Sequence, residues 1–160
     1  MSKVYSINKV QNIPASVEEV WDFISSPKNL KEITPPEMGL KITSEITFEK
    51  IHAGQIIAYI FTPILGIKLR WVTEITQMQE NKYFVDEQRF GPYSFWHHQH
   101  FLKPIEGGTE MLDIVHYKIP FGFVGDMANA ILVTGQLSKV FDFRYLRIEE
   151  KFGAYKSNKP

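Results

Sequence analysis

The order of strand-like and helical segments predicts an α+β fold, in which a seven-stranded curved antiparallel sheet wraps around a long C-terminal helix. A first strand and two short helical segments precede six strand-like runs between about residues 40 and 119. One long amphipathic segment, over about residues 126–152, closes the chain. A terminal helix after such a meander packs most economically across the concave face of the sheet. A curved sheet around a helix tends to leave a cavity, which favours binding of an apolar small molecule.

Turn residues separate the strand-like runs by short links, which indicates hairpins and hence antiparallel neighbours. The first run covers residues 4–13 and ends at Pro14. The later runs are each bounded by turn residues and cover residues 40–48, 55–61, 67–78, 82–90, 94–103 and 109–119.

The helical segments carry recognisable start and stop signals. Ser16 and Glu19 form a predicted capping box before a short helix, and Pro27 suits the first position of a second one. In the long C-terminal helix, side chains at spacings of three, four and seven should face the sheet: Met127, Ile131, Thr134, Phe141, Tyr145, Ile148 and Phe152. Gly153 suits a left-handed C-terminal cap. We expect a single domain over residues 1–153 and a flexible tail over 154–160.

Composition excludes several classes of function. Lys+Arg and Asp+Glu number 18 each, so the net charge is zero, and nothing suggests a nucleic-acid partner. Cysteine is absent, which excludes disulfides, thiol catalysis and cysteine metal sites. No apolar stretch is long enough to span a bilayer, and the first residues lack the apolar core of a signal peptide, so we expect a cytoplasmic protein. The aromatic content of 14% is high, and large rings can line roomy cavities.

The connections between strands differ at the two ends of the predicted sheet. Those after the second, fourth and sixth strands are mostly polar, whereas those after the third, fifth and seventh are apolar and aromatic. The apolar ones could close the core against the short helices. Alternatively, they form a rim around a ligand entrance, built from Ile64, Leu65, Tyr93, Phe121 and Phe123.

The densest polar feature is the strand segment Trp96-His97-His98-Gln99-His100. Strand alternation places Trp96, His98 and His100 on one face. On the next strand, Asp113 shares a face with residues that look like core, so it should point inward and need a partner. His98 or His100 is the obvious one.

A His–Asp cluster of this kind has several uses. It can bind a metal, act as a general base, or anchor the polar end of a mainly apolar ligand. It can also be a buried network that only fixes strand register. We favour no metal, no cofactor and no assigned catalytic residue, with His98, His100 and Asp113 as candidates for any catalysis.

Other aromatic and charged residues also have expected places in the fold. We expect Trp71, Trp96, Tyr117, Phe141 and Tyr145 to line the ligand cavity together with the His–Asp cluster. Charged strand residues should lie mostly on the solvated convex face: Glu74, Asp86, Glu87 and Arg89. Arg144 and Arg147 should solvate the last helix.

Two segments resemble the opening of the SRPBCC superfamily, which is START-like and birch-pollen-allergen-like. They are residues 14–23, PASVEEVWDF, and residues 27–36, PKNLKEITPP. Further positions resemble an uncharacterised bacterial subgroup labelled polyketide cyclase-like: Arg70-Trp71, Asp86-Glu87-Gln88, Gly91-Pro92-Tyr93, Trp96, His98, His100, Asp113, Tyr117 and Pro120-Phe121-Gly122. The resemblance covers nearly the whole chain. It implies a helix-grip fold with an internal hydrophobic cavity, and it implies no catalytic residue.

The predicted function is therefore carriage or sensing of a hydrophobic or amphipathic small molecule. One alternative is a cyclase or dehydratase acting on a polyketide-like substrate through His98, His100 and Asp113. Another is an interaction module whose apolar loops dock a protein partner. The sequence is compatible with a homodimer.

Overall fold

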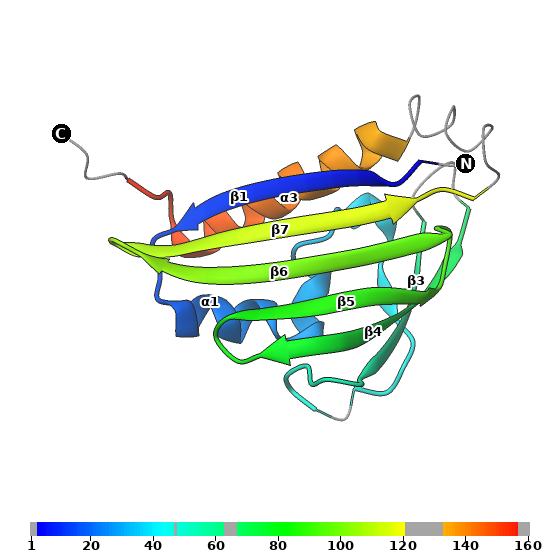
Figure 1. The fold of residues 1–160 in the computed structure, drawn as a ribbon, viewed down its shortest axis with the longest axis horizontal. Helices are drawn as coiled ribbons and strands as arrows, with labels where there is room; N and C mark the ends of the chain where they lie inside the picture. The colour runs from blue at the N-terminus through cyan, green and yellow to red at the C-terminus, as the bar shows by residue number, and fades with distance from the viewer. Residues whose placement is uncertain (1–2, 47, 63–66, 121–132, 157–160) are drawn as a thin grey trace.

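Seven antiparallel strands form one sheet that curves around a C-terminal helix (Figure 1). This computed structural model describes residues 3–46, 48–62, 67–120 and 133–156. The strands lie in the order β1-β7-β6-β5-β4-β3-β2, so that the first strand of the chain pairs with the last. Their bounds are β1 Tyr5–Ile13, β2 Lys41–Ile42, β3 Ile56–Phe61, β4 Leu69–Gln79, β5 Tyr83–Phe90, β6 Phe95–Ile105 and β7 Gly108–Lys118. The predicted helix-grip α+β fold is confirmed.

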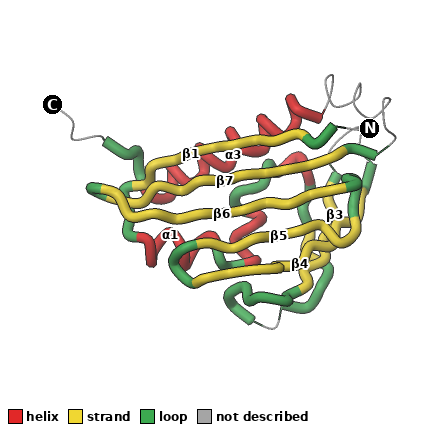
Figure 2. Tube along the Cα trace, in the orientation of Figure 1, coloured by secondary structure: helices red, strands yellow, loops and turns green. Residues whose placement is uncertain are grey.

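The helices lie together on one side of the sheet, behind it in the view of Figures 1 and 2. They are α1 Val17–Ile24, the 3-10 turns η1 Pro27–Lys31 and η2 Pro36–Met38, and α3 Thr134–Phe152. The predicted capping box begins α1: Ser16 Oγ accepts from the Glu19 amide at 3.2 Å, and the Ser16 amide donates to the Glu19 carboxylate at 2.9 Å. Within the described ranges, no helix is long and apolar enough to cross a membrane.

Two expectations about the ends of elements differ from the structure. The second strand, expected over residues 40–48, is only Lys41–Ile42. It ends early because Ser44 Oγ accepts from the Ala58 amide at 3.1 Å, where a paired strand would offer a backbone carbonyl. Gly153 has φ 93° and ψ 166°, which is not the left-handed helical cap that we expected. The early part of the predicted last helix, residues 126–132, lies outside the described residues.

Strict alternation on β6 and β7 decides which side chains face α3. On β7 every second residue from Thr109 to Tyr117 is buried, and on β6 the buried set includes Trp96, His98 and His100. Helix α3 packs against this face with Leu137, Phe141 and Ile148, which are all buried. Complete burial of an aliphatic side chain such as Ile148 contributes about 1.5–3 kcal/mol to folding. These contacts hold the helix against the concave face.

Candidate functional site

A cavity of about 300 Å³ lies between the concave face of the sheet, the short helices and α3. Its wall is mainly apolar and aromatic, with contributions from Phe23, Leu30, Ile57, Phe61, Trp71, Trp96, Leu137 and Ile148. This volume is at the lower end of the range for small-molecule sites, about 300–1,000 Å³. The cavity that the order of elements predicted is therefore present.

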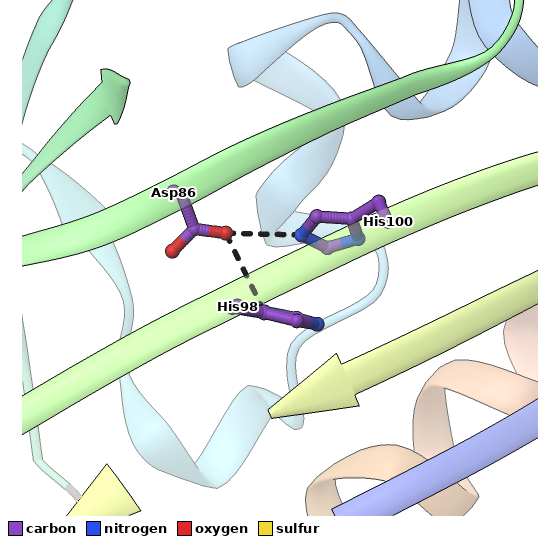
Figure 3. A group of neighbouring side chains, drawn as sticks. All are labelled: Asp86, His98 and His100. Carbon is purple, nitrogen blue, oxygen red and sulfur yellow. Dashed lines mark hydrogen bonds and ion pairs between the residues drawn. The ribbon is translucent and has the colours of Figure 1, made fainter. Parts of the chain in front are cut away.

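One part of the cavity wall is polar: β5 and β6 supply the side chains that line it, and β7 supplies a carboxylate behind them. Asp86 on β5 lies opposite His98 on β6, and His100 on β6 lies opposite Asp113 on β7. Because opposite and diagonal neighbours on one face lie close together, these registers bring two carboxylates and two imidazoles into one group. Asp86, His98 and His100 point toward one another in Figure 3. We call these four residues the His–Asp cluster.

Within the cluster, each imidazole contacts both carboxylates. Asp113 Oδ1 lies 3.1 Å from His98 Nε2 and 2.7 Å from His100 Nδ1. Asp86 Oδ1 lies 3.4 Å from His98 Nδ1 and 3.0 Å from His100 Nε2. Thr73 Oγ1 donates to the other oxygen of Asp86 at 3.4 Å. The predicted pairing of an inward Asp113 with His98 and His100 is confirmed.

Aromatic side chains hold the two imidazoles in place. The Phe84 ring stacks on His100, with centroids 4.0 Å apart, and the two imidazole centroids are 3.8 Å apart. Trp96 and Phe141 contact His98 with their rings nearly perpendicular to it. The orientation of both imidazoles is thus fixed by packing as well as by hydrogen bonds.

Burial and charge set different protonation states for the two histidines. Burial, reinforced by the neighbouring His100, lowers the pKa of His98 to about 4, so His98 is neutral at pH 7. Burial also disfavours a charged His100, but the carboxylates of Asp113 and Asp86 outweigh it and raise the pKa of His100 above its ordinary value. Burial would raise the pKa of Asp113, yet His100, His98 and Arg144 hold it well below the usual range. The pKa of Asp86 is also lowered, because the histidines outweigh burial.

Arg144 on α3 completes the polar part of the wall. Its Nη1 lies 3.7 Å from Asp113 Oδ1, and its guanidinium lies 5.2 Å from the centre of the Phe141 ring. The side chain is only 12% exposed and lines the cavity. The prediction that Arg144 merely solvates the last helix was wrong, since the helix presents this residue to the sheet.

Three buried N–H groups in this region lack an acceptor within the described part of the chain: Trp71 Nε1, Trp96 Nε1 and Arg144 Nε. Tyr59 lies beside Trp71, with the two rings stacked at 6.0 Å between centroids. Burial, together with the charge of Asp86, raises the pKa of the Tyr59 hydroxyl well above its ordinary value, so this group stays a neutral donor. The polar end of the cavity is therefore rich in donors.

The structure separates the predicted lining residues into three groups. Trp71, Trp96, His98 and His100 line the cavity. Three others are buried next to the cavity residues without lining it: Asp113, Tyr117 and Phe141. Tyr145 is 43% exposed and lines a smaller hollow of about 50 Å³. The structure thus does not place Tyr145 in the cavity wall, because Arg144 takes the inward position at this turn of the helix.

Of the predicted entrance residues, Tyr93 is described, and it lines the cavity and packs on Trp71 and Trp96. Four others lie outside the described residues: Ile64, Leu65, Phe121 and Phe123.

Sequence reasoning missed Asp86, which was expected on the convex face with Glu74, Glu87 and Arg89. Those three do form an outward network, in which Arg89 Nε donates to Glu74 at 2.6 Å and Arg89 Nη1 to Glu87 at 3.2 Å. Asp86 faces the other way because strand alternation puts it on the same side as buried Phe84. That parity was the signal that could have found it.

Comparisons with known proteins identify the fold only. No family model matches the chain, and no curated protein matches its sequence. Solved structures do match: a protein of Chromobacterium violaceum has a TM-score of 0.70 at 16% identity, covering 94% of this chain and 99% of that one. A protein of Rhizobium leguminosarum has a TM-score of 0.69 at 12% identity, covering 94% and 97%. Major latex-like protein 151 of Panax ginseng has a TM-score of 0.67 at 10% identity, covering 93% and 97%. The chain therefore shares its fold with a latex-like protein and with bacterial proteins, in agreement with the birch-pollen-allergen-like fold that the sequence indicates.

Proposed function

We propose that this protein binds a hydrophobic or amphipathic small molecule in the cavity between the sheet and α3. The observation that carries the proposal is an apolar cavity of about 300 Å³ with one polar end, formed by the His–Asp cluster and Arg144. Apolar walls supply most of the affinity of such sites, while a few fixed polar groups orient the ligand.

The polar end favours a ligand that carries oxygen acceptors. Arg144 supplies a cation, and the indole N–H groups of Trp71 and Trp96 have no acceptor among the described residues. A buried donor without an acceptor costs about 1–3 kcal/mol, which a ligand oxygen could recover. A carboxylate or carbonyl at one end of an apolar body fits this arrangement.

A neutral fluorescent probe, N-phenyl-1-naphthylamine, tests whether the cavity binds apolar rings. Val140→Phe places a larger side chain in the wall on α3, because Val140 lines the cavity. Leu146→Phe is the matched control on the same helix, since Leu146 is exposed. We expect at least about tenfold weaker probe binding for Val140→Phe, equivalent to about 1.4 kcal/mol, and unchanged binding for the control. Equal affinity in all three proteins would reject the cavity as the binding site.

Acid–base catalysis on the bound molecule is a second candidate function. The observation that favours it is a neutral His98 beside His100 in the wall of the cavity, which supplies a base and an acid together. An enolisable apolar ketone, 2-tetralone, should then exchange its α-hydrogens in deuterated buffer faster with wild-type protein than with His98→Gln. Equal exchange rates would leave binding as the function. Docking of a protein partner through the apolar connections stays a prediction, since most of those connections lie outside the described residues.

A further inference from the structure

The geometry of the His–Asp cluster points to a site for a divalent transition-metal ion, and we propose that Asp86, His98 and His100 are its ligands. Zn²⁺ is the ion that this donor set fits most simply. This inference goes beyond the proposed function, because probe binding in the apolar part of the cavity requires no metal.

The donor atoms of the three residues already converge. His98 Nδ1 and His100 Nε2 both face Asp86 Oδ1, at 3.4 and 3.0 Å. All three ligand atoms lie within 4.8 Å of one another. An ion with bonds of about 2.0–2.2 Å keeps its ligand atoms roughly 3–4 Å apart. Figure 3 shows the three side chains facing one another. Small rotations would therefore bring all three ligand atoms to coordination distance.

The second carboxylate explains why the histidines present these particular nitrogens. Asp113 Oδ1 lies 3.1 Å from His98 Nε2 and 2.7 Å from His100 Nδ1. If both of those nitrogens donate to Asp113, the free nitrogens are His98 Nδ1 and His100 Nε2, which face Asp86. The raised pKa of His100 means that a metal ion must displace the proton on its Nε2, after which both nitrogens offer a lone pair. Metal-binding histidines usually donate their other N–H to a carboxylate in this way. Here a single aspartate would orient both ligands.

The position of the site in the wall leaves room for further ligands. Asp86, His98 and His100 all line the large cavity, whereas Asp113 does not line it and borders the smaller hollow. An ion held by the three would therefore have protein behind it and the cavity in front of it. Three protein ligands with open positions are typical of sites where the metal contacts a bound molecule or water.

Charge and donor type restrict which ion fits. Asp86 and Asp113 together carry two negative charges, and Arg144, 3.7 Å from Asp113, offsets one of them. A divalent ion would therefore keep one positive charge, which an anionic oxygen entering from the cavity could balance. Two imidazoles and one carboxylate favour Zn²⁺, Fe²⁺ or Co²⁺ over Mg²⁺ and Ca²⁺, which prefer oxygen ligands.

The convex face of the same strands supplies a matched control. His97 on β6 lies beside His116 on β7, with ring centroids 6.5 Å apart, and His97 Nδ1 lies 2.8 Å from Glu87 Oε1. This outward group has the same residue types, but it is more exposed, with 26% of the His97 side chain accessible. If metal binds only adventitiously to surface histidines, this outward group is where it would bind.

The test is a titration of the full metal-free chain with Co²⁺, followed by visible absorption, and with Zn²⁺, followed by calorimetry. We expect one equivalent to bind wild type and the His97→Gln/His116→Gln protein alike. Asp86→Asn, which keeps the shape of the side chain, should weaken binding at least about 100-fold. Asp113→Asn should weaken it by about 10–100-fold, the usual effect of losing a carboxylate behind the ligands.

A second measurement on wild-type protein identifies the nitrogens that bind the metal. Nitrogen NMR of the wild-type histidines should show Zn²⁺-induced shifts at His98 Nδ1 and His100 Nε2, and little change at His97 and His116. Loss of binding in the His97→Gln/His116→Gln protein, unchanged binding in a folded Asp86→Asn protein, or no binding at millimolar metal would each overturn the proposal.

Discussion

Replacing Asp113 with Ala should destabilise the fold by about 3 kcal/mol. The carboxylate is 3% exposed and accepts from two imidazoles, with Arg144 nearby. Removing one partner of a buried charged pair costs about 3–5 kcal/mol. The lower end applies here, because His100 can lose its proton to solution once its strongest partner is gone.

Urea unfolding at pH 7, with a chelator present, measures this loss. With a slope of about 2 kcal/mol per molar urea, the midpoint should fall by about 1.5 M. Asp113→Asn separates charge from hydrogen bonding, since the contacts of Asp113 with His98, His100 and Arg144 all use Oδ1, which the amide oxygen can replace. The urea midpoint of Asp113→Asn should therefore lie between those of wild type and Asp113→Ala.

The control is Glu110→Ala on the same strand. Glu110 alternates onto the convex face, opposite Lys103, where substitutions usually stay within about 0.5 kcal/mol. If Asp113→Ala loses less than about 1 kcal/mol at an unchanged slope, the cluster is not the coupled buried network that the distances imply.

The remaining predictions concern pH, the cation and the first helix. Stability should be greatest near about pH 6.5, the pKa of an unfolded histidine. Below it the unfolded chain protonates His98 while the folded chain, with a pKa of about 4, does not, so stability falls with pH. Above it, the raised pKa of His100 makes stability fall as the pH rises through that pKa, and a flat pH profile of urea midpoints would contradict both assignments. Arg144→Met should weaken binding of the acidic probe 1-anilinonaphthalene-8-sulfonate about tenfold relative to neutral N-phenyl-1-naphthylamine; Arg147→Met, on the exposed side of α3, should change neither affinity. Ser16→Ala should cost about 1 kcal/mol in urea unfolding, and no change would mean that the capping box is not formed in solution.

The sequence predicted the His–Asp pairing because two long, uninterrupted strands carry it. β6 and β7 are paired over their full length without a bulge, so counting residues by two gives the right face for His98, His100 and Asp113. β5 is harder, because its pairing with β4 shifts register twice. The charge of Asp86 favoured the convex face, as for Glu87, although strand alternation turns Asp86 inward, to the side of Phe84.

The last helix illustrates a different limit. Residues at three and four positions after Phe141 are both on the side that a helix can bury. Which of them enters the core depends on how the helix crosses the sheet, and composition favoured the aromatic Tyr145 over the charged Arg144. The structure places Arg144 inward because Asp113 provides its partner. This ion pair joins residues on two elements that no local sequence pattern connects. Asp142, two residues before Arg144, pairs instead with Lys9 on the edge strand β1.

The His–Asp cluster and the cavity are best understood together. Replacing buried ion pairs with apolar residues of similar volume is often neutral or stabilising, so stability alone gives little reason to keep two carboxylates and two imidazoles in a core. Three of these four side chains line the cavity, and the fourth orients two of them. Phe84, Trp96 and Phe141 then hold the imidazoles where a bound molecule or ion would meet them. This polar network lies in the cavity wall and is supported by Asp113 and by aromatic side chains. Such an arrangement is typical of a binding site whose polar groups are held in position before the ligand binds.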